Sequence, residues 1–256
     1  MRRRPALTWD EVKEIDRKYR ARLRSLITVD GAVESYVHAL WRAWELGNTY
    51  VFYFTDNGWR MGNHALHSGK NTPYTEDVES PLVVRGPHVA QNTRSYRLVS
   101  NTDLAPTFAE IANASPTSSV DDRSILPLMR GQDVPWRDAL LVESKNPYPW
   151  PRGWPAYKAV RTSTYAFHFY PETGEEKLYD LDADPYQLQS VHDDPDYAEV
   201  KSTLKSKLAA LKRSRTARVR RAKPLRMEGS RHVGSFREFA STICRPAYTL
   251  AHLARD

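Results

Sequence analysis

Asp56, Asn57 and Lys70 are residue types that could do chemistry together. Asp56 and Asn57 directly follow an apolar run, and Lys70 follows in the same polar stretch. A carboxylate and an amide oxygen are hard donors that suit Ca²⁺ or Mg²⁺. A metal ion and a lysine at one spot could neutralise a sulfate or phosphate group as it transfers. The alternative is a type I′ hairpin turn, because Asn57-Gly58 is the commonest signal for that turn.

Two histidines, His64 and His67, lie between this acid–amide pair and Lys70. Isolated histidines are usually structural or solvated, so their position alone assigns neither of them a role in this chemistry.

The neighbouring elements predict where these residues lie in the fold. Thr49 to Thr55 is a short, continuous apolar run, typical of a parallel-type strand covered on both faces. Ligands of open α/β sheets bind at the carboxyl ends of strands, and Asp56 and Asn57 occupy such an end. Upstream, the stretch that begins at Thr8 predicts a capping box and then one long or two stacked helices, to about residue 46.

Downstream, the pattern predicts a second short strand in residues 80–87 and a helix that opens near Pro106. Later strands are predicted in residues 139–144, 157–171 and 176–181, the middle stretch being a hairpin. An amphipathic helix over residues 194–214 closes the pattern. This order predicts an α/β sandwich with a small antiparallel C-terminal part.

Composition excludes several classes of protein. With 256 residues, 40% of them hydrophobic, and with seven Trp and fourteen Tyr, the chain can bury a sizeable core. No apolar stretch approaches the roughly 18 residues of a membrane helix, and the basic start lacks the apolar segment of a signal peptide. The single cysteine, Cys244, excludes an internal disulfide framework and a cysteine-based zinc site.

The net charge of +7 belongs to one segment of the chain. Residues 212–226 carry eight basic and no acidic residues, and without them the rest of the chain is near −1. Clustered Lys and Arg bind polyanions, so this segment could attract a sulfated polysaccharide. The alternative is a solvated helix end, because no aromatic residues interleave the charges as stacking on bases requires.

The stretch from residue 54 to 89 resembles the C-terminal half of the sulfatase family, within the alkaline phosphatase superfamily. The matching motifs are Asp56-Asn57-Gly58, Gly69-Lys70, Pro73-Tyr74, Pro81-Leu82 and Arg85-Gly86-Pro87. Similar motifs follow in the family's order over residues 99–114, 154–170 and 176–191, and residues 19–40 resemble the helix before the Asp-Asn-Gly strand. The resemblance covers roughly Leu7 to Leu211, with arylsulfatase and glucosamine-6-sulfatase types the most similar.

The resemblance implies a central sheet covered by helices on both faces, with a small antiparallel C-terminal subdomain. It implies that Asp56 and Asn57 supply half the ligands of a divalent cation, usually calcium, and that Lys70 contacts the sulfate. It also places His64 where some members carry a histidine that faces substrate. The implied reaction is hydrolysis of the sulfate ester of a small molecule or glycan to an alcohol and sulfate.

Two parts of the family's pattern are not found here. Sulfatases use a cysteine in C-x-P-S-R that is oxidised to formylglycine, and further aspartates complete their metal site. Cys244-Arg245-Pro246-Ala247 begins like that motif, but Tyr248 stands where the arginine is expected. We therefore expect a truncated form that lacks the N-terminal part of the fold, binds calcium poorly and by itself hydrolyses no sulfate ester.

The predicted organisation has three parts. Residues 1–145 are predicted to form the C-terminal part of a sulfatase catalytic domain. Residues 146–211 are predicted to form a small antiparallel sheet with a closing helix. Residues 212–256 are predicted to form a weakly structured tail, and its basic residues are concentrated in 212–226. Two other functions stay open: a phosphate or phosphonate ester hydrolase of the same superfamily, and a non-catalytic remnant or polyanion-binding domain. The compartment is not assigned, although family members are often exported.

Overall fold

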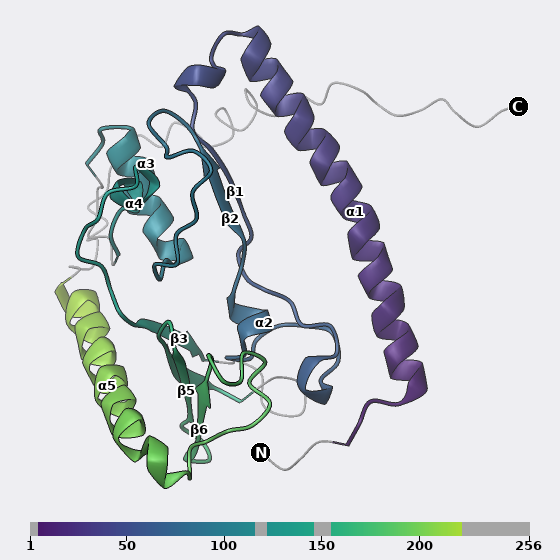
Figure 1. The fold of residues 1–256 in the computed structure, drawn as a ribbon, viewed down its shortest axis with the longest axis vertical. Coiled ribbons are helices and arrows are strands. Elements are labelled where there is room, and N and C mark those ends of the chain that lie inside the picture. Colours follow the sequence, from purple (N-terminus) through teal and green to yellow (C-terminus); the bar gives the residue numbers. More distant parts are fainter. Residues whose placement is uncertain (1–4, 116–121, 146–154, 222–256) are drawn as a thin grey trace, which may run out of the picture. The chain divides into compact units, whose positions relative to one another are not determined.

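The computed structural model describes residues 5–115, 122–145 and 155–221 (Figure 1). One compact unit comprises Met1–Arg220. Helices and short strands are interspersed up to Met129, and four consecutive strands then precede the last described helix. In order they are α1 (Trp9–Arg42), β1 (Val51–Phe54), α2 (Thr75–Val78), β2 (Leu82–Arg85), α3 (Leu104–Ile111), α4 (Leu126–Met129), β3 (Leu140–Ser144), β4 (Tyr157–Arg161), β5 (Tyr165–Tyr170), β6 (Glu175–Asp180) and α5 (Ala198–Arg221).

Helix α1 begins where the sequence predicts. The Thr8 Oγ1 accepts from the Glu11 N–H at 3.4 Å, and the Glu11 carboxylate accepts from the Thr8 N–H at 2.7 Å, which confirms the predicted capping box. The helix ends at Arg42, because Trp44 adopts a left-handed backbone with φ 60°. The last predicted turn is instead a separate 3₁₀ turn over Leu46–Asn48.

Strands β1 and β2 form a two-stranded antiparallel sheet, with Val51 opposite Arg85 and Phe54 opposite Leu82. The predicted parallel-type pairing of β1 is therefore wrong. One face packs on the cluster of α3 and α4 through Phe52 and Val84. On the other face Tyr53 and Val83 are 38% and 63% exposed, so the described residues do not supply the cover that the sequence predicted there.

The second sheet has the strand order β3-β4-β5-β6, with every pair antiparallel. The predicted hairpin is confirmed as β4–β5. Helix α5 covers this sheet (Figure 1), and its Leu204 and Leu208 join the buried Val160, Phe167 and Leu178. The small antiparallel part with a closing helix is thus present as predicted.

Helix α5 continues to Arg221, so residues 212–221 are helical and do not belong to a weakly structured tail. Ala, Lys and Arg are strong helix formers, and basic residues suit the C-terminal end of the helix dipole, which explains the extension. The remaining residues of that segment, Cys244 among them, lie outside the described part, as do residues 146–154 at the predicted domain boundary. That boundary stays a prediction.

Among the described helices, none combines the length and the apolar character that a membrane span needs.

Candidate functional site

Asp56, Asn57 and Gly58 form a turn immediately after β1. Neither Asn57 nor Gly58 has a positive φ, and β1 does not pair with the segment that follows the turn but with β2. The type I′ hairpin is therefore excluded. Instead, the Gly58 N–H donates to the Asp77 carbonyl of α2 at 3.0 Å, which fixes the turn against α2.

The structure brings Lys70 to this turn, as the sequence predicts. The Lys70 Nζ donates to the Asn57 Oδ1 at 2.7 Å and lies 3.8 Å from the Asp56 Oδ2. The side chains of Lys70 and Asp56 remain 41% and 84% exposed. Two oxygen donors and one cation therefore share a small, accessible area.

Sequence reasoning missed one residue that supports the turn. The Asn101 Nδ2 donates to the Asp56 carbonyl at 2.6 Å, from a 3₁₀ turn over Asn101–Asp103. Ser100 and Asp103 cap this turn reciprocally. The signal was in the sequence, because Ser-x-x-Asp before an apolar helix is a capping pattern.

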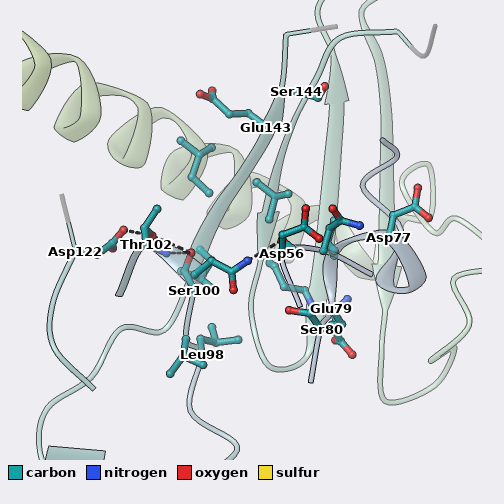
Figure 2. A pocket seen from close by; sticks show the side chains of 18 of the residues that line it. Asp56, Asp77, Glu79, Ser80, Leu98, Ser100, Thr102, Asp122, Glu143 and Ser144 are labelled. Carbon is teal, nitrogen blue, oxygen red and sulfur yellow. Dashed lines mark hydrogen bonds and ion pairs between the residues drawn. The ribbon is translucent and has the colours of Figure 1, made fainter. Parts of the chain in front are cut away.

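A cavity of about 1040 Å³ opens beside these residues. In the view of Figure 2, Asp56 lies between Asp77 on one side and Ser100 and Thr102 on the other. Among the described residues, four cations line the cavity: Lys70, Arg123, Arg137 and Arg161.

These cations differ in how they are engaged. Arg137 donates to the fully buried Asp103 at 3.0 Å, and Arg161 is paired with Glu79. Arg123 lies over the Trp136 ring at 4.7 Å. Lys70 is hydrogen-bonded to a neutral amide and keeps much of its side chain exposed. An anionic group that enters the cavity can therefore reach Lys70.

The structure does not bring His64 to this group. The His64 ring stacks on Tyr74 with 3.7 Å between centroids, and its Nε2 lies 3.3 Å from the Glu76 carboxylate. Burial acts to raise the pKa of Glu76, but the hydrogen bonds from His64 and Asn63 outweigh it, so that pKa lies below its usual value. Contact between His64 and a substrate stays a prediction. His67 lies 3.1 Å from Glu11.

Asp56 and Asn57 fit part of a cation site. Both oxygens lie close to one ammonium nitrogen, so both could reach a single cation, and both are hard donors. Ca²⁺ takes six to eight oxygens. Within the described residues no group of three or more acidic, His or Cys side chains gathers to hold a metal ion. These two residues thus supply only some of the ligands that calcium needs.

Two families match the chain. The family described as N-sulphoglucosamine sulphohydrolase, C-terminal, matches residues 62–214, and the family described as sulfatase matches residues 4–114. Human N-acetylglucosamine-6-sulfatase is 39% identical over 139 residues, which are 54% of this chain and 25% of the human protein. The chain thus spans about a quarter of the length of the human, bovine and goat relatives that it matches.

Solved structures share the fold. A protein in complex with its substrate D-glucosamine-2-N,6-O-disulfate superimposes with a TM-score of 0.69 at 24% identity, over 75% of this chain and 40% of that one. The phosphonate monoester hydrolase of Agrobacterium radiobacter gives a TM-score of 0.64 at 25% identity, over 72% of this chain and 39% of that one. The predicted sulfatase-like fold is confirmed.

The first family covers more than half of the chain, and it includes Lys70, the cavity wall of β3 and β4, and the closing helix α5 as far as residue 214. The second covers the Asp56-Asn57-Gly58 turn and helix α1. Together with the sulfatase relatives and the shared fold, these matches confirm the resemblance seen in the sequence. This chain belongs to the sulfatase family.

Proposed function

We propose that the site of Asp56, Asn57 and Lys70 serves the hydrolysis of a sulfate ester to an alcohol and sulfate. The observation that carries the proposal is the exposed Lys70 ammonium beside two oxygen donors at the wall of a large cavity. The substrate class is a sulfated glucosamine or a glycan that contains it. The name of the human relative, N-acetylglucosamine-6-sulfatase, supports this class.

Each residue of the site has a role that suits its chemical type. Lys70 contacts the sulfate group and stabilises negative charge on its oxygens as the ester bond breaks. Asp56 and Asn57 would hold a divalent cation, Ca²⁺, together with ligands beyond the described residues. When bound, such an ion supplies further positive charge next to the sulfate. Asn101 holds the Asp56 backbone and so keeps the carboxylate at the cavity.

The chain's only cysteine is Cys244, in a context that departs from the family's modification motif. We therefore propose that this 256-residue chain binds sulfated ligands through Lys70 and does not turn them over.

Binding of glucosamine 6-sulfate tests the proposal directly. In isothermal titration calorimetry with calcium present, we expect Lys70→Ala to weaken binding by roughly tenfold, because the cation that meets the anion is lost. Lys207→Ala is the matched control, since Lys207 lies on α5 and pairs with Asp138, and neither of these two residues lines the cavity. Equal affinity of Lys70→Ala and wild type would contradict the proposed role of Lys70.

Turnover tests the second half of the proposal. We expect no release of sulfate from an aryl sulfate above the Lys70→Ala background. Clear turnover by the wild-type chain, absent in Lys70→Ala, would show that the chain is a complete enzyme.

A phosphonate or phosphate ester hydrolase is the second candidate. The structural likeness to the phosphonate monoester hydrolase of Agrobacterium radiobacter favours it, because sulfate and phosphonate esters are both tetrahedral anions that a lysine and a metal ion can hold. Parallel titrations with a phosphonate monoester separate the two. Preference for the phosphonate over glucosamine 6-sulfate would select this candidate.

A further inference from the structure

A buried ion pair lies beneath the candidate site and touches both of its segments. Arg60 is paired through Nη1 with the Asp77 Oδ2, and the two side chains are 3% and 1% exposed. Asp77 belongs to the cavity lining (Figure 2), but its carboxylate is too buried to meet a ligand.

The pair fixes both ends of the segment that carries Lys70. On one side, the backbones of Arg60 and Gly69 exchange two hydrogen bonds, of 3.0 and 3.1 Å. On the other side, the Asp77 Oδ2 accepts from the Thr72 N–H at 2.8 Å and from the Thr72 hydroxyl at 2.6 Å. Lys70 lies between Gly69 and Thr72, so both neighbouring anchors depend on the same two charged residues.

The Arg60 guanidinium also lies directly against Gly69. A β-carbon built on Gly69 would be 3.2 Å from the Arg60 Nη2. The segment before Lys70 is thus in tight contact with the arginine, and a residue larger than glycine would require one of the two to shift by a few tenths of an ångström.

Asp77 also holds the segment that carries Asn57. Its carbonyl accepts from the Gly58 N–H at 3.0 Å, which fixes the turn of Asp56 and Asn57 on α2. The side chain of Asp77 therefore positions the lysine segment, and its backbone positions the asparagine turn. The 2.7 Å hydrogen bond from the Lys70 Nζ to the Asn57 Oδ1 joins these two segments.

We infer that the Arg60–Asp77 ion pair is the positioning element of the site, which holds the Lys70 ammonium at Asn57 and at the cavity. Arg60 and Asp77 touch no ligand and act through Lys70. The effect of the ion pair on sulfate binding rests on the proposed function. The effect of the ion pair on the position of Lys70 can be tested independently of that function.

The test compares how fast each lysine is acetylated by an N-hydroxysuccinimide ester, read site by site by peptide mass spectrometry. Asp77→Asn keeps the size and one acceptor oxygen but removes the charge that holds Arg60. We expect Lys70 to react several-fold faster in this variant, as fast as in Asn57→Ala, because its segment is released from the hydrogen bond to Asn57. The rates at Lys177 and Lys207 should stay as in wild type.

Leu204→Ala is the control for a loss of stability alone. Leu204 lies on α5 and is buried in the cluster that joins this helix to the second sheet. That cluster includes neither Gly69 nor Thr72, so the substitution should lower the melting temperature and leave Lys70 unchanged. An equal rise at Lys70 in both variants, or none in a folded Asp77→Asn, would overturn the inference.

Thr72→Val provides a second variant if Asp77→Asn does not fold. It removes one hydrogen bond to Asp77 and keeps the ion pair, so we expect a smaller rise at Lys70 in the same direction. An unchanged Lys70 rate in folded Thr72→Val would count against the inference.

Binding of glucosamine 6-sulfate then shows whether the pair acts through Lys70. Asp77→Asn should weaken binding, and the double variant with Lys70→Ala should bind no more weakly than Lys70→Ala alone, since coupled residues are not additive. Additive losses would show an independent structural effect and would overturn the inference. If no sulfated ligand binds wild type while Lys70 is released as expected, the proposed function fails and the positioning role stands.

Discussion

Gly58 shows at the scale of one residue how tightly the candidate site is built. A β-carbon there would lie 2.2 Å from the Glu76 carbonyl oxygen and 2.5 Å from that of Glu79, and both are backbone atoms that cannot turn away. The turn of Asp56 and Asn57 can therefore approach α2 only because residue 58 has no side chain.

We expect Gly58→Ala to lower the free energy of unfolding by about 2 kcal/mol or more, because the added methyl forces the turn off α2. Urea denaturation measures the change. Gly31→Ala is the matched control: Gly31 lies within α1, nothing lies within 4 Å of its built β-carbon, and alanine there should stabilise by up to about 1 kcal/mol. Similar effects of the two substitutions would contradict the steric argument.

His168 is the second residue with a measurable consequence. It is fully buried among Tyr74 and Tyr179, and neither of its ring nitrogens has a hydrogen-bond partner among the described residues. Burial, reinforced by the charges of Lys177 and Arg161, lowers the pKa of His168 to about 3. The folded state therefore keeps the ring neutral at pH values where the unfolded chain takes up a proton.

The sign of the pH effect follows from that depressed pKa. The contribution of His168 to stability is fully present above pH 6.5, the pKa of an ordinary histidine, and is lost as the pH falls toward 3. Between pH 7 and 5 the wild type should lose about 2 kcal/mol more unfolding free energy than His168→Phe, which cannot titrate. His38→Gln, an exposed change on α1, should keep the wild-type slope. Equal slopes of wild type and His168→Phe would contradict this account.

At the scale of elements, α1 stands apart because it buries so little of its apolar surface. Ile15 is its only buried residue among the described side chains, and Arg22 lies over the Trp59 ring at 4.9 Å. Apolar residues farther along the helix are exposed, from 39% to 74%. They are Tyr19, Leu23, Leu26, Ile27, Val29, Val33, Tyr36 and Trp41.

An exposed stripe of this kind should bind the hydrophobic dye ANS. We expect the double variant Leu23→Gln/Leu26→Gln to lose roughly a third of the ANS fluorescence of the folded chain, since it removes apolar surface at the middle of the stripe. Arg20→Gln/Arg24→Gln changes the same two turns without removing apolar side chains and should leave the signal unchanged. Undiminished fluorescence in the leucine variant would place the dye elsewhere.

At the scale of the whole molecule, charge is unevenly distributed. The net charge is +7 with a sequence pI near 9.4, yet residues 212–226 alone carry eight basic residues. The helix α5 includes 212–221, so part of this charge lies on one helix end. We propose that this segment binds sulfated polysaccharides through their anionic groups.

Retention on a heparin column tests that proposal. Replacing the eight basic residues of 212–226 by glutamine should abolish retention near 0.15 M salt, because each lost contact with an anion weakens binding and its salt dependence. A control with Lys13, Arg20, Arg24 and Arg42 replaced by glutamine should keep most of the retention. Unchanged elution of the first variant would leave the segment as a solvated helix end.

The sequence by itself determined the local features and the family. Local features depend on residues that are close in the chain, so the sequence alone predicts them. Examples are the capping box at Thr8, the β4–β5 hairpin and the chemical types of Asp56, Asn57 and Lys70. The family motifs lie in one order along the chain, so the resemblance can be recognised from the sequence alone. The length of α5 was underestimated because good helix formers simply continue to Arg221.

Only the tertiary structure decided which distant segments meet. The antiparallel partner of β1, the stacking of His64 on Tyr74 and the Asp77 carboxylate beneath Lys70 all depend on packing between residues separated by loops. A continuous apolar run such as β1 is compatible with either a parallel or an antiparallel partner. Whether a histidine is buried cannot be read from its place in the sequence. These features depend on which apolar surfaces bury each other from water, and only the packed molecule determines that.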